Sequence, residues 1–325
     1  MEKVKEGKIM KVAILESLGI SKEELEARKA PFIAQGVEFV EYAKTTDTDA
    51  LIEEAKDADA MIIANMPMPG QVISACENLK FIDVAFTGVD HVGLSAAKEK
   101  GIKVSNASGY SNEAVAELAL GMILSLYRYL REVESSCRIG STKDGFVGYE
   151  IKGKTVGIVG LGKIGTRSAE IYHTLGADIV SYSRTIHSDA PDYVKQVSLD
   201  ELLAVSDIVI LHTPLNDDSR GLINADKLKL MKKSAILINV ARGPVVVSRD
   251  LAEALKNGTI AGAGIDVFDK EPPLDVMTEP ILYAPNCLVT PHVAFATKES
   301  MTLRAEIVFE NLKAFMDGGQ INKVL

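Results

Sequence analysis

The stretch that decides the fold is Val156-Gly157-Ile158-Val159-Gly160-Leu161-Gly162-Lys163-Ile164-Gly165, which contains the pattern Gly-x-Gly-x-x-Gly. It ends a short apolar run and opens a segment with helical periodicity. Gly160 can make a tight turn, Gly162 lets a pyrophosphate approach the backbone, and Gly165 lets helix and strand pack closely. The unpaired N–H groups at the helix start would then attract the phosphates. The stretch therefore predicts a dinucleotide site, with a glycine turn that binds no ligand as the alternative.

Strand and helix patterns alternate after this loop. Apolar runs separated by helical segments predict six strands, at Thr155–Val159, Asp178–Tyr182, Asp207–His212, Ala235–Val240, Gly262–Asp266 and Cys287–Thr290. Nearly continuous apolar strands between helices indicate a parallel sheet covered on both faces. Six is also the number of strands in a complete doubly wound dinucleotide fold, so we expect one here.

A smaller α/β unit precedes the glycine loop. Its predicted strands are Ile9–Leu15, Met61–Ala64 and Phe81–Ala85, and its predicted helices include Gln71–Cys76 and Leu94–Lys100. The last segment, Lys298–Met316, has the pattern of a long amphipathic helix and follows the complete second sheet. If this helix returns to the first unit, that domain is discontinuous in sequence.

Composition and charge narrow the classes of partner. The 325 residues carry 36 Lys and Arg against 45 Asp and Glu, a net charge of −9, which argues against nucleic acid. The longest nearly apolar run, 114–130, contains Glu117 and is too short to span a bilayer, so it predicts a buried helix. Three scattered cysteines fit a reducing cytoplasm and have no metal-ligand spacing. We expect a cytoplasmic protein that binds neither a metal nor a membrane.

The end of the second strand of the cofactor sheet decides which dinucleotide binds. A site that prefers NAD places Asp or Glu there to hold the ribose 2′-hydroxyl. This chain has Ser183, Arg184 and Thr185 at that place. An arginine can pair bidentately with a 2′-phosphate, which a carboxylate would repel. The sequence therefore favours NADP(H), and NAD(H) remains possible if Arg184 is only a solvent-exposed loop residue.

Three polar residues, Arg242, Glu271 and His292, follow strands of the predicted cofactor sheet. Ligands of open α/β sheets bind at this edge. Reduction of a 2-oxo acid needs a cation for the carboxylate, such as Arg242, and a proton donor near neutral pH, such as His292. A neighbouring carboxylate, such as Glu271, would raise the pKa of the histidine and orient its ring. Any one of them alone is more often structural, but together they favour carbonyl reduction.

The chain resembles the D-isomer-specific 2-hydroxyacid dehydrogenase family over essentially its full length. Besides the glycine loop, the resemblance is carried by Phe86-Thr87-Gly88-Val89-Asp90, Asn106-Ala107-Ser108-Gly109-Tyr110, Leu211-His212-Thr213-Pro214-Leu215, the stretches 239–243 and 264–273, and Thr290-Pro291-His292. It implies an α/β protein of two domains, each a parallel sheet with flanking helices. A Rossmann-type cofactor domain, 106–298, would be inserted in a flavodoxin-like substrate-binding domain made of 1–105 and 299–325.

The resemblance also implies roles for single residues. Arg242 would grip the substrate, Glu271 would support His292, and protonated His292 would donate to the carbonyl oxygen as hydride arrives from the nicotinamide. Backbone N–H groups of Thr87 and Gly88 would hold the substrate carboxylate. Cofactor contacts would come from Gly160, Gly162, Lys163, Ile164, Gly165, His212, Thr213, Pro214, Val240, Ala241 and Asp266, the last of them on the nicotinamide amide. Members are commonly homodimers joined through the cofactor domain, so 115–128 is a candidate interface helix, with a plain core helix as the alternative.

The family leaves several substrates open. The first-domain loop Ile63–Pro69 contains no Arg or Lys to bind the phosphate of phosphoglycerate, and 106–115 is similar to glycerate and hydroxypyruvate enzymes. Met66 and Met68 suggest a soft apolar wall that could admit a longer side chain. We expect a reductase of glyoxylate or hydroxypyruvate. The alternatives are bulkier 2-oxo acids, phosphoglycerate and, from another class, a cofactor-sensing binding protein or corepressor.

Overall fold

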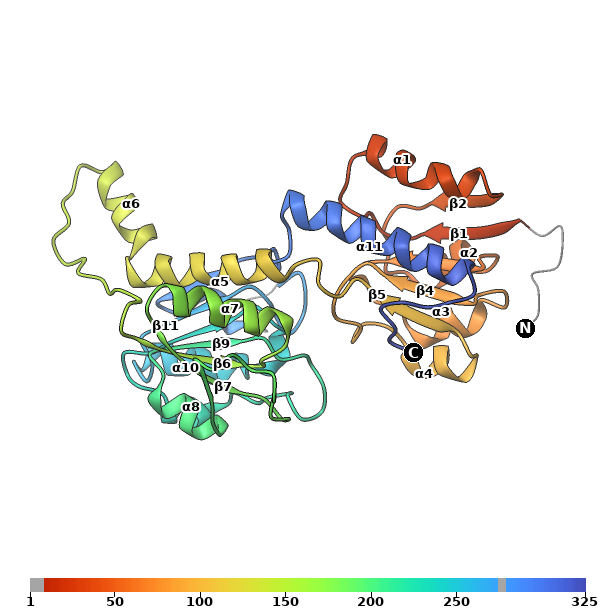
Figure 1. The fold of residues 1–325 in the computed structure, drawn as a ribbon. Helices are drawn as coiled ribbons and strands as arrows, with labels where there is room; N and C mark the ends of the chain where they lie inside the picture. The colour runs from red at the N-terminus through yellow and green to blue at the C-terminus, as the bar shows by residue number, and fades with distance from the viewer. Residues whose placement is uncertain (1–8, 274–278) are drawn as a thin grey trace. The chain divides into compact units, whose positions relative to one another are not determined.

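The computed structural model describes residues 9–273 and 279–325. The chain forms two compact units, shown in Figure 1. Unit 1 contains the residues up to Ser111 together with Ala296–Leu325, and unit 2 is Asn112–Phe295. Unit 1 is thus discontinuous in sequence, and the chain leaves it after Ser111 and re-enters it at Ala296, where we had expected boundaries after 105 and 298.

Unit 2 is built on a seven-stranded parallel sheet with the order β12-β11-β10-β9-β6-β7-β8. Its strands are β6 (Thr155–Val159), β7 (Asp178–Tyr182), β8 (Val194–Gln196), β9 (Ile208–Leu211), β10 (Ile236–Asn239), β11 (Gly262–Ile265) and β12 (Cys287–Val289). The six predicted strands are present, and β8 is an additional strand that the sequence pattern did not predict. The winding reverses between β6 and β9, the kind of place where doubly wound sheets bind ligands.

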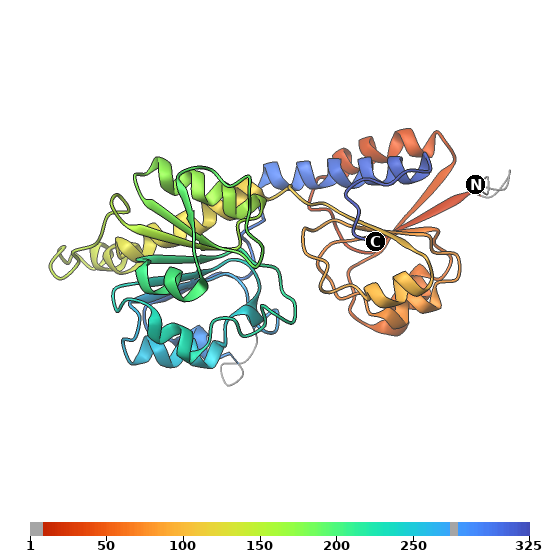
Figure 2. The same cartoon turned by 60° about the horizontal axis from the view of Figure 1, so that its bottom comes forward.

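Helices cover both faces of this sheet (Figures 1 and 2). The helices of unit 2 are α5 (Asn112–Tyr127), α6 (Leu130–Arg138), α7 (Lys163–Thr174), α8 (Leu199–Val205), α9 (Ala225–Leu230) and α10 (Ser248–Lys256), with short 3-10 turns at Gly243–Val245 and Pro280–Tyr283. Of these, α6 does not cover the sheet. Side chains alternate along each strand, so Ile208 and Ile210 of β9 join the core under α5 and α7. Val209 and Leu211 join the second core, under α8, α9 and α10. The continuous apolar runs in the sequence follow from this two-sided burial.

The predicted helix 114–130 is interrupted in the structure. Tyr129 adopts a left-handed backbone conformation with φ of +52°, and this turn separates α5 from α6. Helix α5 buries Val115, Met122 and Ile123 in the core of unit 2, as expected for a core helix. Helix α6 instead projects from the body of unit 2 in Figure 1 and has no buried residue along its described length.

Unit 1 contains a five-stranded parallel sheet with the order β2-β1-β3-β4-β5, a flavodoxin-like arrangement. Its strands are β1 (Met10–Ile14), β2 (Val37–Glu41), β3 (Ala60–Ile63), β4 (Phe81–Val84) and β5 (Lys103–Asn106). Its helices are α1 (Lys22–Ile33), α2 (Thr48–Ala55), α3 (Gly70–Ala75), α4 (Leu94–Glu99) and α11 (Lys298–Met316). Strands β1, β3 and β4 and helices α3, α4 and α11 were predicted from the sequence, whereas β2, β5 and α2 were not.

The C-terminal helix α11 completes unit 1, as its position in the sequence suggested. The ring of Phe315 stacks on Phe81 of β4 with the centroids 4.6 Å apart. Asn311 donates from Nδ2 to Oδ1 of Asp83, 2.9 Å away, and to the backbone oxygen of Asn106. Asp83 is fully buried, and burial raises the pKa of its carboxyl well above the usual range. The helix therefore contributes both apolar and polar contacts to the centre of the unit.

Candidate active site

The glycine loop joins β6 to α7, and its three glycines meet different constraints. Gly160 has φ of +99°, and a Cβ there would lie 2.8 Å from the carbonyl carbon of His212. A Cβ on Gly165 would lie 2.0 Å from the backbone oxygen of Gly160. Packing alone therefore requires both glycines. At Gly162, by contrast, a Cβ would meet no described atom within 4 Å.

This open space lies at the start of α7, a helix of 12 residues whose N-cap is Gly162. The first N–H groups of a helix have no partner within the helix, and the helix dipole adds positive potential there. Space together with N–H donors is what a pyrophosphate needs. The loop geometry therefore fits a dinucleotide.

A cavity of about 340 Å³ opens beside the glycine loop and gathers residues from the carboxyl ends of three neighbouring strands. Of the predicted cofactor contacts, it is lined by Gly160, Gly162, Ser183, Arg184, Thr185, His212, Thr213 and Pro214. It is also lined by residues that the sequence analysis did not single out, namely Val159, Leu161, Tyr182, His187, Asn216, Asp218, Ser219 and Leu222. The remaining predicted contacts, Lys163, Ile164, Gly165, Val240, Ala241 and Asp266, lie outside the lining of this cavity.

Two residues after β7 make side-chain contacts with other loops that line the cavity. The Oγ atom of Ser183 accepts a hydrogen bond of 2.9 Å from the N–H of Leu161 in the glycine loop. On the other side, Nη1 of Arg184 lies 2.5 Å from Oδ2 of Asp218. Both members of this ion pair are largely exposed, with 74% and 70% of their side-chain surface accessible. The predicted phosphate partner thus already has an anionic neighbour, which no spacing in the sequence indicated.

His212, directly after β9, is a neutral group in this cavity. Its Nε2 lies 2.9 Å from the hydroxyl of Ser168 on α7. Burial lowers the pKa of His212 to about 4. The ring therefore contributes a polar but uncharged wall at neutral pH.

Glu271 and His292 form a hydrogen-bonded pair. Nδ1 of His292 lies 2.6 Å from Oε2 of Glu271, and Oε1 of Glu271 accepts from the N–H of Phe268. Burial by itself would raise the pKa of Glu271, but the hydrogen bond and charge of His292 and the charge of Arg242 lower it. Because Glu271 engages Nδ1, Nε2 is the nitrogen from which His292 would transfer a proton.

A close contact between two loops brings Arg242 near this pair. A Cβ on Gly243 would lie 2.0 Å from the backbone carbon of Phe268, so only glycine lets the loop after β10 pack against the loop that carries Glu271. Asn239 donates to the backbone oxygen of Arg242, and Nη1 of Arg242 donates to the oxygen of Ala241. The guanidinium is therefore held on the loop whose position the glycine contact determines.

Asp266 supports the turn that carries His292. Its side chain is fully buried, and its carboxylate accepts hydrogen bonds from Thr290 Oγ1 and from the N–H groups of Val293 and Ala294, at 2.6 to 2.9 Å. Its backbone oxygen accepts from the N–H of His292, which has φ of +52°. Burial raises the pKa of Asp266 against these hydrogen bonds. These contacts hold the turn that carries His292, and the predicted contact of Asp266 with a nicotinamide amide stays a prediction.

The predicted substrate residues of unit 1 differ in exposure: Thr87 and Gly88 are partly exposed, whereas Met66 is buried. Thr87 has a buried Oγ1 with no hydrogen-bond partner in the described chain, and its backbone oxygen accepts from Asn106 Nδ2. Gly88 follows it and is half-buried. Met66 and Met68 have no exposed surface. The side chain of Met66 is thus buried, and its predicted part in a soft apolar substrate wall stays a prediction.

The loop around Met66 also has a cation beside it that the loop sequence does not show. Lys44, from a distant part of the chain, lies 2.5 Å from Oε1 of Glu16 and donates to Oδ1 of Asn65. The other oxygen of Glu16 accepts from the N–H groups of Ala64 and Met66. The charge of Lys44 is thus matched by a carboxylate of unit 1 itself.

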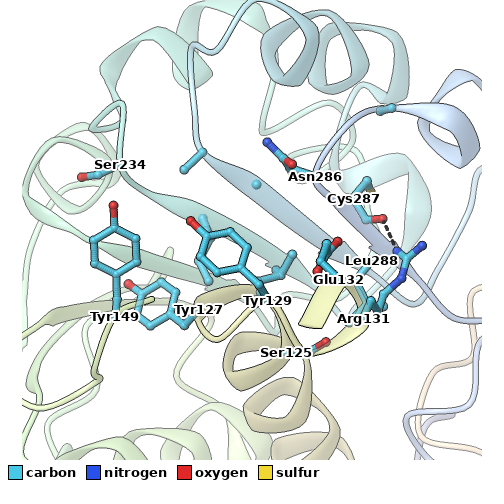
Figure 3. Close-up of a pocket in the computed structure, with 15 residues that line it drawn as sticks. Ser125, Tyr127, Tyr129, Arg131, Glu132, Tyr149, Ser234, Asn286, Cys287 and Leu288 are labelled. Carbon is cyan, nitrogen blue, oxygen red and sulfur yellow. Dashed lines mark hydrogen bonds between the residues drawn. The ribbon is translucent and has the colours of Figure 1, made fainter. Parts of the chain in front are cut away.

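A second cavity, of about 210 Å³, lies at the amino ends of β10, β11 and β12 (Figure 3). The rings of Tyr127 and Tyr149 lie with their centroids 5.5 Å apart there, Tyr129 lines the same cavity, and Arg131 donates to the backbone oxygen of Cys287. The strands are parallel, so this cavity is at the edge of the sheet opposite the glycine loop. None of the predicted site residues lines this second cavity, whereas several predicted cofactor contacts line the cavity beside the glycine loop.

Among residues 9–273 and 279–325, no group of three or more His, Cys, Asp or Glu side chains is arranged to hold a metal ion. In the same part of the chain, no helix combines the length and apolar character needed to cross a membrane.

Comparisons with known proteins agree with this geometry. The family described as "D-isomer specific 2-hydroxyacid dehydrogenase, NAD binding domain" matches residues 120–294. A hydroxypyruvate reductase of Blautia hydrogenotrophica is 32% identical over 97% of this chain and 99% of its own length. A glyoxylate reductase of Thermococcus litoralis is 35% identical over 87% of this chain and 88% of its own. The solved structure of an acyclic imino acid reductase with NADPH and D-Arg is 25% identical, with a TM-score of 0.89 over 97% of this chain and all of that one.

The lowered pKa of His212 predicts a dependence of stability on pH. Its pKa is about 4 when folded, below the ordinary value of about 6.5, so the unfolded chain takes up a proton more readily. The free energy of unfolding should therefore decrease as the pH falls from about 6.5 towards 4. Urea denaturation across this range should show a smaller decrease for His212→Gln than for the unchanged chain.

The same substitution at the exposed His173 is the matched control, and it should leave the decrease as large as in the unchanged chain. An identical pH profile for His212→Gln and the unchanged chain would show that burial of this ring does not influence folding.

Proposed function

We propose a reaction and a substrate class for this chain, which belongs to the D-isomer-specific 2-hydroxyacid dehydrogenase family and is an oxidoreductase with an NAD-binding domain. The proposed reaction is the reduction of glyoxylate or hydroxypyruvate with a nicotinamide dinucleotide. The observation that supports it best is the 2.6 Å hydrogen bond between Glu271 and His292, with Arg242 close enough to influence Glu271. We propose unit 2 as the cofactor domain and unit 1 as the substrate-binding domain.

In the proposed reaction, Arg242 binds the carboxylate and carbonyl oxygen of the 2-oxo acid, because a planar guanidinium can donate two parallel hydrogen bonds. Protonated His292 donates from Nε2 to the carbonyl oxygen as the alcohol forms. Glu271 orients the ring and stabilises the imidazolium. The bound dinucleotide supplies the hydride. The backbone N–H groups of Thr87 and Gly88 in unit 1 contribute further donors for the substrate carboxylate.

For the cofactor, we propose a preference for NADP(H), with NAD(H) also accepted. Ser183, Arg184 and Thr185 line the cavity beside the glycine loop and bring a cation and hydroxyl groups to the place of the ribose. The structurally similar imino acid reductase was solved with NADPH. Asp218 opposes this preference, because it pairs with Arg184.

For the substrate, the names of the relatives support small 2-oxo acids, since a hydroxypyruvate reductase and a glyoxylate reductase are similar to most of the chain. Met66 and Met68 have no exposed surface, so they give bulkier acids no added support. Phosphoglycerate has no added support, because Lys44 near the first-domain loop is already paired with Glu16.

A substrate panel tests the proposed reaction. The purified protein with NADPH should consume the cofactor with glyoxylate or hydroxypyruvate at about 1 s⁻¹ or faster, the rate of an ordinary enzyme. The measurement is the decrease in NADPH absorbance. Faster turnover of a bulky 2-oxo acid or of a phosphorylated acid would contradict the proposed substrate class.

The variant His292→Ala is the internal control for this assay. Loss of the proton donor should lower turnover by about a hundredfold or more, while NADPH binding remains. Glu271→Gln, which keeps the size of the side chain, should retain more activity than His292→Ala. Full activity of His292→Ala would remove His292 from the proposed reaction.

The proposed cofactor preference predicts an asymmetric effect of Arg184→Ala. Loss of the guanidinium should weaken NADPH binding by about tenfold and leave NADH binding nearly unchanged, because NADH has no 2′-phosphate. Fluorescence titration with each dinucleotide measures both affinities. Equal weakening of both would mean that Arg184 does not recognise the phosphate.

We also propose that the chain forms a homodimer through unit 2. Helix α6 and the loop after it expose Leu130, Ile139 and Val147 to 49%, 82% and 85%. The segment that carries them projects from unit 2 in Figure 1. Large exposed apolar side chains on such a segment favour a protein interface. A second copy of this chain would cover them.

Light scattering after gel filtration tests the dimer, since the mass should be twice the 35.0 kDa of one chain. The double variant Leu130→Glu, Ile139→Glu should shift the protein to the monomer, because each change places a charge in the proposed interface. Leu230→Glu, at an exposed apolar position on α9, is the control and should leave the mass unchanged. A monomeric unchanged chain would contradict the proposal.

A further inference from the structure

The rim of the cofactor cavity carries a charge pair whose anionic member has no part in the proposed reaction. Asp218 lies on the loop after β9, and Arg184 lies on the loop after β7. Their side chains meet with Nη1 and Oδ2 2.5 Å apart, and both residues line the cavity. The guanidinium proposed to receive the 2′-phosphate therefore already contacts a carboxylate.

The position of Asp218 is determined by its backbone. Oδ1 of Asn216 accepts hydrogen bonds from the N–H groups of Asp218 and Ser219. The hydroxyl of Ser219 in turn donates to the oxygen of Pro214 and accepts from the N–H of Asn216. This network forms a tight turn within the cavity lining, and Ser219 is buried. The carboxylate is thus anchored at the rim by a structured turn.

The neighbouring acid, Asp217, provides a contrast. It carries the same charge one residue earlier, but it is absent from the described lining of the cavity. Any effect of the overall charge of the loop on a dinucleotide would be shared by both acids. An effect specific to the rim would belong to Asp218 alone.

From these contacts we infer that Asp218 determines cofactor specificity, by competing with the 2′-phosphate of NADP(H) for Arg184 and so reducing the preference over NAD(H). The inference rests on the proposed cofactor site. A phosphate with a charge of about −2 must approach a guanidinium whose charge Asp218 balances, and it is repelled by the carboxylate itself. NAD(H) has a 2′-hydroxyl instead of this phosphate, so it neither competes with Asp218 for the guanidinium nor is repelled by the carboxylate. The chain is therefore suited to both cofactors, although it lacks the acid at the end of β7 that typifies NAD sites.

Asp218→Asn removes the charge and keeps the size of the side chain. The turn should survive, because its hydrogen bonds use the backbone N–H of residue 218. Two unit charges at about 5 Å in a largely aqueous setting interact enough to change affinity by a few-fold, and a doubly charged phosphate feels more. We expect Asp218→Asn to bind a ligand with a 2′-phosphate about fivefold to tenfold more tightly.

The experiment measures binding by calorimetry, without turnover, and uses matched fragments and dinucleotides. 2′,5′-ADP and NADPH carry the 2′-phosphate, whereas 5′-AMP and NADH do not. Asp218→Asn should tighten the first pair of ligands and leave the second pair within about twofold. Asp217→Asn should leave all four within about twofold. The tightening should shrink at high salt, because the groups are exposed.

A double variant with Arg184→Ala separates competition from simple repulsion. With the guanidinium removed, Asp218→Asn should tighten 2′,5′-ADP clearly less than in the unchanged background, since there is no cation left to release. The inference is overturned if Asp218→Asn weakens 2′,5′-ADP, if it tightens phosphorylated and unphosphorylated ligands alike, or if Asp217→Asn has the same effect.

The binding data distinguish failure of the proposed cofactor site from failure of the proposed role of Asp218. If the unchanged chain binds none of the four ligands, the cofactor site itself is wrong, and the inference falls with it. If all four bind and their ratio is the same in Asp218→Asn, the proposed function stands and only the role of Asp218 is refuted.

Discussion

Seven parallel strands impose the constraint from which the site of unit 2 follows. Because they run in the same direction, the segments after β6, β7, β9, β10, β11 and β12 all emerge at one edge of the sheet. The glycine loop, Arg184, Arg242 and His292 are far apart in sequence, yet each leaves the sheet at that edge. Close backbone contacts then adjust their positions, since the contact of Gly243 with Phe268 leaves no room for a Cβ. The sheet thus brings the functional side chains to one edge, and contacts between the loops determine their final positions.

The fold was predictable from sequence wherever strands are buried on both faces. Such strands are continuous apolar runs, and the runs that became β6, β9 and β10 are buried throughout or nearly so. The strands that were missed carry a weaker signal. Strand β8 has three residues at an edge of its sheet, and β2 lies at the edge of the other sheet with two exposed glutamates, Glu38 and Glu41. An edge strand buries little surface, so its sequence is close to that of a loop.

The candidate site was predictable in its residue types but not in its detailed partners. The types of Glu271 and His292 suggested a pair, and the structure places them in hydrogen-bond contact. The partners of Asp266 could not be read from the chain, because they depend on backbone N–H groups that a turn directs towards it. Asp218 reaches Arg184 from 34 residues away. The folded loops determine which carboxylate oxygens already accept a hydrogen bond or pair with a cation, and the spacing of residues in the sequence does not show it.

Glu16 acts in unit 1 as a built-in anion. One of its oxygens occupies the N–H groups of Ala64 and Met66, and the other faces the ammonium group of Lys44. Two convergent amides and a lysine form a receptor for an oxyanion, and here the chain fills that receptor itself. A relative with a small neutral residue at position 16 would keep the amides and the lysine but lose the occupant. A single replacement behind the loop would thereby turn a structural support into a vacant docking point for an acidic group.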